Sequence, residues 1–131
     1  MKGFDSIPAE TEQIATAIVD SAYLVHRTLG PGLLESVYEA CLAHEISLRA
    51  IPIRSQVSLP VQYKDLRLES ALRLDLLVAD KVIVELKAVE RMLPLYESQL
   101  LTYLKLSGLR LGLLINFDVP AIKTGIRRIV L

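Results

Sequence analysis

Residues 70–89 read SALRLDLLVADKVIVELKAV, and this stretch decides the fold. Apolar and polar residues alternate in both halves, as in strands that bury one face. Two such strands gain most when both apolar rows lie on the same side of the sheet, and a slip of one residue would turn one row outward. We therefore expect a hairpin in which Val78 pairs with Val82 and the loop is Ala79-Asp80-Lys81. The predicted apolar rows are Leu72, Leu74, Leu76 and Val78 on the first strand and Val82, Val84 and Leu86 on the second.

The same register places Asp75 opposite Glu85, with their β-carbons about 5 Å apart. Lys87 follows Glu85 by two positions and projects from the same face. Carboxylates this close repel each other unless one takes up a proton or a cation lies between them. Magnesium bound by one or two carboxylates suits the arrangement. These residues also allow a plainer interpretation, in which cross-strand Glu–Lys or Asp–Arg pairs lie on a solvated sheet face.

Length and composition limit the classes of protein to consider. A chain of 131 residues is long enough for a single domain over residues 1–131 and too short for two ordinary ones. Lysine and arginine together number 15, as do aspartate and glutamate, so the net charge is zero. This balance argues against a dominant non-specific electrostatic grip on nucleic acid, which needs a basic excess.

Other features concern the compartment and the assembly. The single cysteine, Cys41, cannot form an internal disulfide, and we expect a buried structural thiol in a reducing cytoplasm. The start of the chain, MKGFDSIPAETEQ, carries acids where a signal peptide needs an apolar run, and no apolar stretch is long enough to span a membrane. We therefore predict a cytoplasmic protein without a membrane span. A hydrophobic content of 52% without tryptophan favours a C2 homodimer.

The remaining elements give an α/β order. Helix-like spacing covers residues 10–29, and Leu29-Gly30-Pro31-Gly32 ends this first helix. Pro60 interrupts the third predicted element, which indicates an edge strand or a bulge. The order is helix, helix, three meandering strands, helix, strand, which predicts a mixed sheet flanked by helices. The further predicted helices are 33–50 and 92–107; the strands are 54–63, 70–78, 82–89, 109–116 and 126–131, with a short helix or turn at 119–125.

The second predicted helix carries Glu35 in its first turn, on nearly the same side as Tyr38. A glutamate there has a purely structural alternative, because it complements the helix dipole and can bond an N-cap amide. His26, near the end of the first helix, is interpreted as structural for a similar electrostatic reason. The inner stripe of the second helix is predicted to hold Leu34, Val37, Cys41, Leu42 and Ile46.

The order α-β-β-β-α-β over residues 33–116, with Asp75 followed by Glu85-Leu86-Lys87, resembles the PD-(D/E)XK nuclease superfamily. The likeness is closer to its small bacterial branch named for a GxxExxY motif, which is matched here by GLLESVY at residues 32–38. VIVELKAVERMLP, ESQLLTYLKLSGLRLGLLINF and IKTGIRRIV also resemble that branch, so the likeness begins near Ile14. It implies a restriction-endonuclease-like core with an extra N-terminal helix. Leu74 stands where the superfamily name has proline, and Tyr96 stands where the branch has histidine.

The resemblance also implies an activity, metal-dependent hydrolysis of phosphodiester bonds in nucleic acid. As the nucleic acid we expect DNA over RNA. Asp75 and Glu85 would hold Mg²⁺ or Mn²⁺, and Lys87, Glu35 and Gln99 would be the catalytic residues. The alternative is a non-catalytic module of the same fold that binds nucleic acid or a partner. We further predict substrate contacts from Tyr38, Arg73 and Tyr103.

Overall fold

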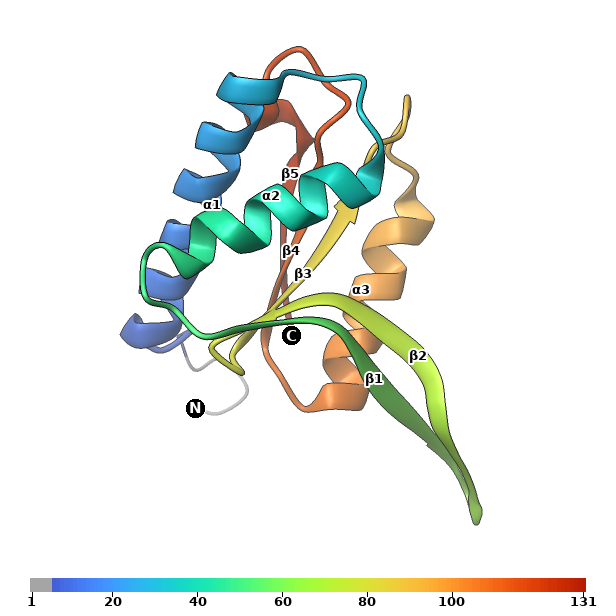
Figure 1. Cartoon of the computed structure of the whole chain (residues 1–131). Coiled ribbons are helices and arrows are strands. Elements are labelled where there is room, and N and C mark those ends of the chain that lie inside the picture. Colours follow the sequence, from blue (N-terminus) through green and yellow to red (C-terminus); the bar gives the residue numbers. More distant parts are fainter. Residues whose placement is uncertain (1–5) are drawn as a thin grey trace.

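The computed structural model describes residues 6–131, so the first five residues of the acidic N-terminal stretch lie outside the described range. The predicted α/β class, with a mixed sheet flanked by helices and an extra N-terminal helix, is confirmed (Figure 1). Within the described range, no helix is both long enough and apolar enough to cross a bilayer. The elements are α1 (Ala9–Leu29), α2 (Glu35–Ser47), β1 (Ile53–Tyr63), β2 (Leu66–Val78), β3 (Val82–Lys87), α3 (Pro94–Ser107), β4 (Leu111–Asn116), η1 (Ile122–Gly125) and β5 (Ile126–Val130).

The strands form a five-stranded sheet in the order β1-β2-β3-β4-β5. All neighbours are antiparallel except β3 and β4, which are parallel and are connected through α3. Helices α1 and α2 cover one face of the sheet, and α3 packs on the other (Figure 1). Every residue of β4 is buried, as expected for a strand covered on both sides. Pro60 lies in the edge strand β1, at a register shift between Leu59 and Val61, so both predicted reasons for its presence apply.

The hairpin register is confirmed, because Val78 pairs with Val82 and Leu76 pairs with Val84. Ala79 and Asp80 both adopt a φ of 54°, and the Lys81 N–H donates to the Val78 carbonyl at 3.0 Å. The loop therefore consists of Ala79, Asp80 and Lys81, as the apolar pattern predicts.

The predicted apolar row of β2 is wrong in its first half. Leu76 and Val78 pack in the cluster beneath α1 and α2, whereas Leu72 and Leu74 pack with α3 on the opposite face. The change of face falls where the β1–β2 ladder skips one pair, between Ser55↔Leu76 and Val57↔Leu74. Gln56, at the skipped position, has a φ of 54°. A distortion of this kind interrupts the alternation of faces, which sequence periodicity alone assumes to continue.

Helix α2 begins later than predicted, and its inner stripe is correspondingly different. Leu34 precedes the helix and is 73% exposed, Val37 is exposed and Cys41 is only half-buried. The helix buries residues spaced four apart, which follow one side of its first three turns. These residues are Tyr38, Leu42 and Ile46.

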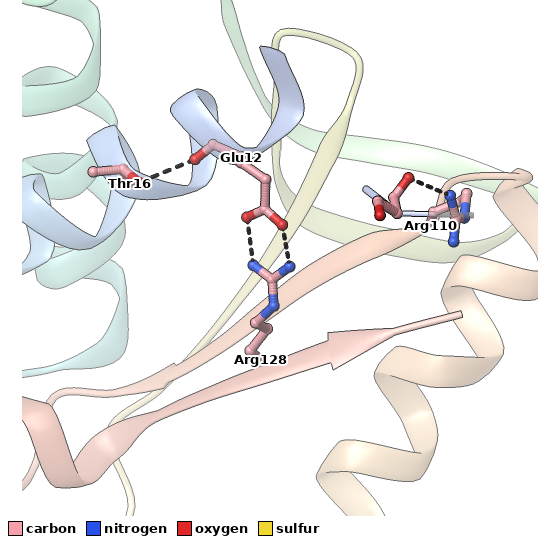
Figure 2. A network of polar contacts seen from close by, with 5 residues as sticks. Glu12, Thr16, Arg110 and Arg128 are labelled. Atoms are coloured by element: carbon pink, nitrogen blue, oxygen red, sulfur yellow. Dashed lines mark hydrogen bonds and ion pairs between the residues drawn. The ribbon is translucent and has the colours of Figure 1, made fainter. Parts of the chain in front are cut away.

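A bidentate ion pair joins the two ends of the chain across one face of the sheet (Figure 2). The Arg128 guanidinium in β5 donates to both carboxylate oxygens of Glu12 in α1, at 2.9 and 2.6 Å. Nearby, Arg110 donates to the Ser6 carbonyl at 3.2 Å. Because the Glu12–Arg128 pair is partly exposed, we expect it to contribute at most about 1 kcal/mol to stability.

Tyr38 fastens the loop between α1 and α2 to the core. Its side chain is fully buried and stacks on Phe117, with ring centroids 4.6 Å apart. The hydroxyl donates to the Gly30 carbonyl at 2.6 Å and accepts from the Leu33 N–H at 3.0 Å. This placement favours a structural role for Tyr38 over the predicted contact with substrate.

Replacing Tyr38 by Phe tests that role. The ring and its stacking would remain, but the Gly30 carbonyl and the Leu33 N–H would lose their partner. We expect the free energy of unfolding to fall by about 1–3 kcal/mol, as measured by urea denaturation. The matched control is Tyr23→Phe, at an exposed position of α1, which should change stability little. An equal effect of both substitutions would contradict the structural role.

Candidate active site

Strands β2 and β3 separate at Asp75 and Glu85, and each carboxylate bonds the backbone of the other strand. The β2–β3 ladder ends at Leu76↔Val84. Beyond it, the Asp75 N–H donates to Oε2 of Glu85 at 2.9 Å, and the Leu86 N–H donates to Oδ2 of Asp75 at 2.9 Å. The two carboxylates are thus held side by side between the strands, and each has a second oxygen that the opposite strand does not bind.

The repulsion expected from the sequence is present in this pair. Glu85 is only 6% exposed, and burial, followed by the negative charge of Asp75, raises its pKa to about 8. Burial also raises the pKa of Asp75, although the bond from the Leu86 N–H and the charge of Lys87 oppose that rise. A positive charge placed between these carboxylates would relieve both effects.

Lys87 lies next to the pair. Its strand β3 alternates, so Ile83, Glu85 and Lys87 project toward the α3 side while Val84 and Leu86 face α1 and α2. Its Nζ is 4.4 Å from the centroid of the Tyr96 ring, which lies in the first turn of α3. The lysine charge lowers the pKa of both carboxyl groups. Tyr96 thus occupies the position of the expected histidine and supports Lys87 by a cation–π contact.

Glu35 extends the acidic cluster from the start of α2. Partial burial raises its pKa first and the charge of Asp75 raises it further, while Lys87 opposes these effects. In the described part of the chain, its carboxylate makes no hydrogen bond to an N-cap amide. The N-cap bond of the structural alternative is therefore absent from the described residues, although Glu35 does lie in the first turn of α2, where its charge suits the helix dipole. Glu35 also lies in the field of the β2–β3 pair.

Of the other predicted residues, Tyr103 lies in the electrostatic field of the two carboxylates. Its side chain is buried on α3, and its pKa is raised first by burial and then by the charges of Glu85 and Asp75. Gln99 lies between Tyr96 and Tyr103 along α3 and is exposed, and no hydrogen bond within residues 6–131 joins it to the pair. Arg73 is exposed on β2, where it pairs with Ser58 beyond the point at which the strands separate.

Two residues near the site were not predicted. Gln56 in β1 donates through Nε2 to both carboxylate oxygens of Glu39 in α2, at 3.0 and 2.9 Å. Burial raises the pKa of Glu39, the Gln56 bond opposes that rise, and the charge of Asp75 adds a smaller increase. Glu39 follows Glu35 by one helical turn, and this i, i+4 spacing could have indicated it. Gln56 carries no comparable signal.

A third unpredicted residue, Asn116, fixes the chain that follows Lys87. Its buried amide accepts from the Val89 N–H at 3.0 Å and donates to the Val89 carbonyl at 2.9 Å. Asn116 ends β4 directly beside Lys87, and the Phe117 N–H bonds the Lys87 carbonyl at 2.9 Å. These contacts hold the backbone that carries Lys87.

The chemistry of the donor atoms suits a hard divalent cation. Among the described residues, no three His, Cys, Asp or Glu side chains are grouped to enclose a metal ion. Magnesium does not need such a cage, because one or two carboxylates with water and substrate oxygens complete its shell. Asp75 and Glu85 each offer one carboxylate oxygen that is not held by the opposite strand. The pair therefore fits a cation that shares its shell with a substrate.

The family follows from a comparison with known proteins. A family model described as the PD-(D/E)XK nuclease superfamily matches residues 12–129. The chain belongs to this superfamily. Its nucleases generally use divalent metal ions. The match is to the superfamily as a whole, so membership of the GxxExxY branch stays a prediction. No curated protein and no solved structure matches the chain.

The raised pKa of Glu85 predicts how stability depends on pH without metal. Between pH 4.5, the ordinary pKa, and about pH 8, the folded protein retains a proton that the unfolded chain releases. Since the folded state then binds more protons, the free energy of unfolding should fall as pH rises through this window. We expect a loss on the order of a few kcal/mol, measured by urea denaturation in EDTA.

Glu85→Gln is the matched variant for this measurement, because a neutral amide has no proton to lose. Its stability should depend less on pH than that of the parent, and it should exceed the parent near the upper end of the window. Equal pH dependence in the two proteins would show that Glu85 does not hold the extra proton.

Proposed function

We propose that this protein is a divalent-metal-dependent phosphodiesterase that cleaves nucleic acid, with DNA as the first substrate to test. The observation that carries the proposal is the interlocked pair Asp75 and Glu85 with Lys87 beside it. Membership of a nuclease superfamily supports nucleic acid as the substrate class. The alternative of a solvated Glu–Lys pair on the sheet surface does not suit these residues, because Glu85 is almost completely buried.

Each residue has a distinct task in this proposal. Asp75 and Glu85 would hold the cation, which would polarise the phosphate and lower the pKa of an adjacent water. Lys87, whose Nζ lies 4.4 Å from the centroid of the Tyr96 ring, would face the phosphate and offset the negative charge that develops during attack. Glu35 would orient the water from α2, and Gln99 and Arg73, both exposed, remain proposed contacts to the substrate or its scissile group.

A second candidate is a non-catalytic module of the same fold that binds nucleic acid or a partner. The charge around the site favours the partner-binding form of this module over the nucleic-acid-binding form, since Glu35, Glu39, Asp75 and Glu85 form an acidic cluster in a chain of zero net charge. Without a cation, this cluster would repel a polyanion. Metal-dependent binding or cleavage of nucleic acid therefore separates the two candidates.

The central experiment compares the parent with Lys87→Ala and Asp75→Asn. Substrates are single- and double-stranded DNA and RNA, with magnesium, manganese or EDTA. Lys87→Ala should lower the cleavage rate by about 10²–10³-fold while manganese affinity changes little. Asp75→Asn should lower both, because it removes a cation ligand.

The matched control is Lys105→Ala, which removes an exposed lysine from the last turn of α3. It should cleave as the parent does. Equal cleavage by the parent and Lys87→Ala would point to a contaminant or to another site. Absence of cleavage together with absence of metal binding would favour the non-catalytic module.

We also propose that the chain forms a C2 dimer through the tip of the β1–β2 hairpin, which extends away from the helices (Figure 1). The pairs Val61↔Leu68 and Tyr63↔Leu66 bring four apolar side chains onto one face of the tip. Tyr63, Leu66 and Leu68 are 64%, 52% and 49% exposed. A second copy would cover this exposed face symmetrically.

Light scattering at micromolar concentrations tests the dimer. The parent should show the mass of two chains, and Leu66→Lys should shift it toward one chain because a charge would enter the buried face. Leu48→Lys is the matched control, since Leu48 is 66% exposed, against 52% for Leu66, but lies at the C-terminal end of α2. A parent of monomer mass would rule out this interface.

A further inference from the structure

Gln56 has a backbone conformation that is costly for its position. Five non-glycine residues of the described chain have a positive φ, and four of them lie in turns or connections. Gln56, with a φ of 54°, lies inside the strand β1. Residues other than glycine pay about 1–2 kcal/mol for this region. Strain of this kind persists where the surrounding structure holds it in place, and it is common near functional sites.

The strain is located opposite a proposed cation ligand. The β1–β2 ladder contains Ser55↔Leu76 and Val57↔Leu74, but the intervening pair, Gln56 and Asp75, is missing from it. Asp75 is also missing from the β2–β3 ladder, which ends at the neighbouring pair Leu76↔Val84. It is therefore unpaired in the ladders on both sides of β2. The distortion frees the Asp75 side chain from regular strand geometry.

The Gln56 side chain then connects two acidic groups on different elements. Its amide donates to both carboxylate oxygens of Glu39 in α2, at 3.0 and 2.9 Å. Burial raises the pKa of Asp75, and hydrogen bonding from the nearby Gln56 side chain is one of the effects that oppose this rise. A neutral amide with two N–H donors can bond two carboxylates without adding charge to the cluster.

We propose that Gln56 is a positioning residue, which holds Asp75 in the orientation needed to bind a divalent cation and fastens α2 to the site through Glu39. The inference rests on the proposed function, because it concerns the geometry of the same cation ligands. Fastening Glu39 also fixes Glu35, which lies one helical turn earlier on α2. One amide thus links β1, β2 and α2 around the carboxylate pair.

Gln56→Gly separates positioning from stability. Glycine accepts a φ of 54° without strain, so relief of strain should offset much of the stability lost with the side-chain bonds. If Gln56 positions Asp75, the variant should bind manganese about 10-fold or more weakly, as is usual when a partner of a metal ligand is removed. Its kcat should fall by a similar factor, with KM for nucleic acid unchanged.

Two further variants sharpen the test. Gln56→Asn keeps an amide and tolerates a positive φ, so it should recover part of the manganese affinity. Gln62→Ala removes an exposed glutamine from the same strand, where its amide bonds the Lys64 carbonyl, and should bind manganese as the parent does. Manganese titration followed by electron paramagnetic resonance gives the affinities independently of cleavage.

The outcomes distinguish this proposal from the proposed function. If the parent binds manganese and cleaves nucleic acid while Gln56→Gly retains the parent's affinity, the positioning role is refuted and the function stands. If the parent binds no metal, the proposed function fails, and metal-free crystal structures of the parent and Gln56→Gly decide the positioning role. A displaced Asp75 carboxylate in the variant would support it, and an unchanged one would overturn it.

Discussion

Two carboxylates take the place of a backbone ladder where β2 and β3 separate, and the rest of the structure depends on this exchange. Strand pairing normally satisfies each backbone N–H with a carbonyl. Here, side-chain oxygens of Glu85 and Asp75 accept the N–H groups of Asp75 and Leu86. The strands can therefore diverge without leaving buried donors unpaired. The opening between them becomes a polar site inside the sheet, between the apolar clusters that cover its two faces.

The surrounding elements hold this opening in place. Tyr38 ties the loop before α2 to the core, which sets the start of the helix that carries Glu35. Asn116 fixes the segment after Lys87, and Tyr96 on α3 contacts the lysine itself. The site thus receives one group from each of several elements, as expected for a function built onto a common core.

Several features of the site oppose folding. The buried carboxylates have raised pKa values, and the backbone at Gln56 lies in a costly region. Each feature opposes folding in the absence of a bound cation, whereas the clusters on both faces of the sheet favour it. Buried carboxylates and a costly backbone conformation that occur together are more typical of a functional site than of a structural core.

The sequence alone determined the α/β order, the hairpin register and the closeness of Asp75 and Glu85. These follow from alternation along neighbouring strands, where a one-residue slip would expose a whole apolar row. Tertiary structure decided what periodicity cannot encode. Leu72 and Leu74 lie on the α3 face because the chain is distorted at Gln56, and Tyr38 is buried because Phe117 and the 30–33 loop surround it. The bond from Gln56 to Glu39 likewise joins residues on separate elements. Such contacts depend on how helices pack against the sheet, and this packing cannot be predicted from a local pattern along the chain.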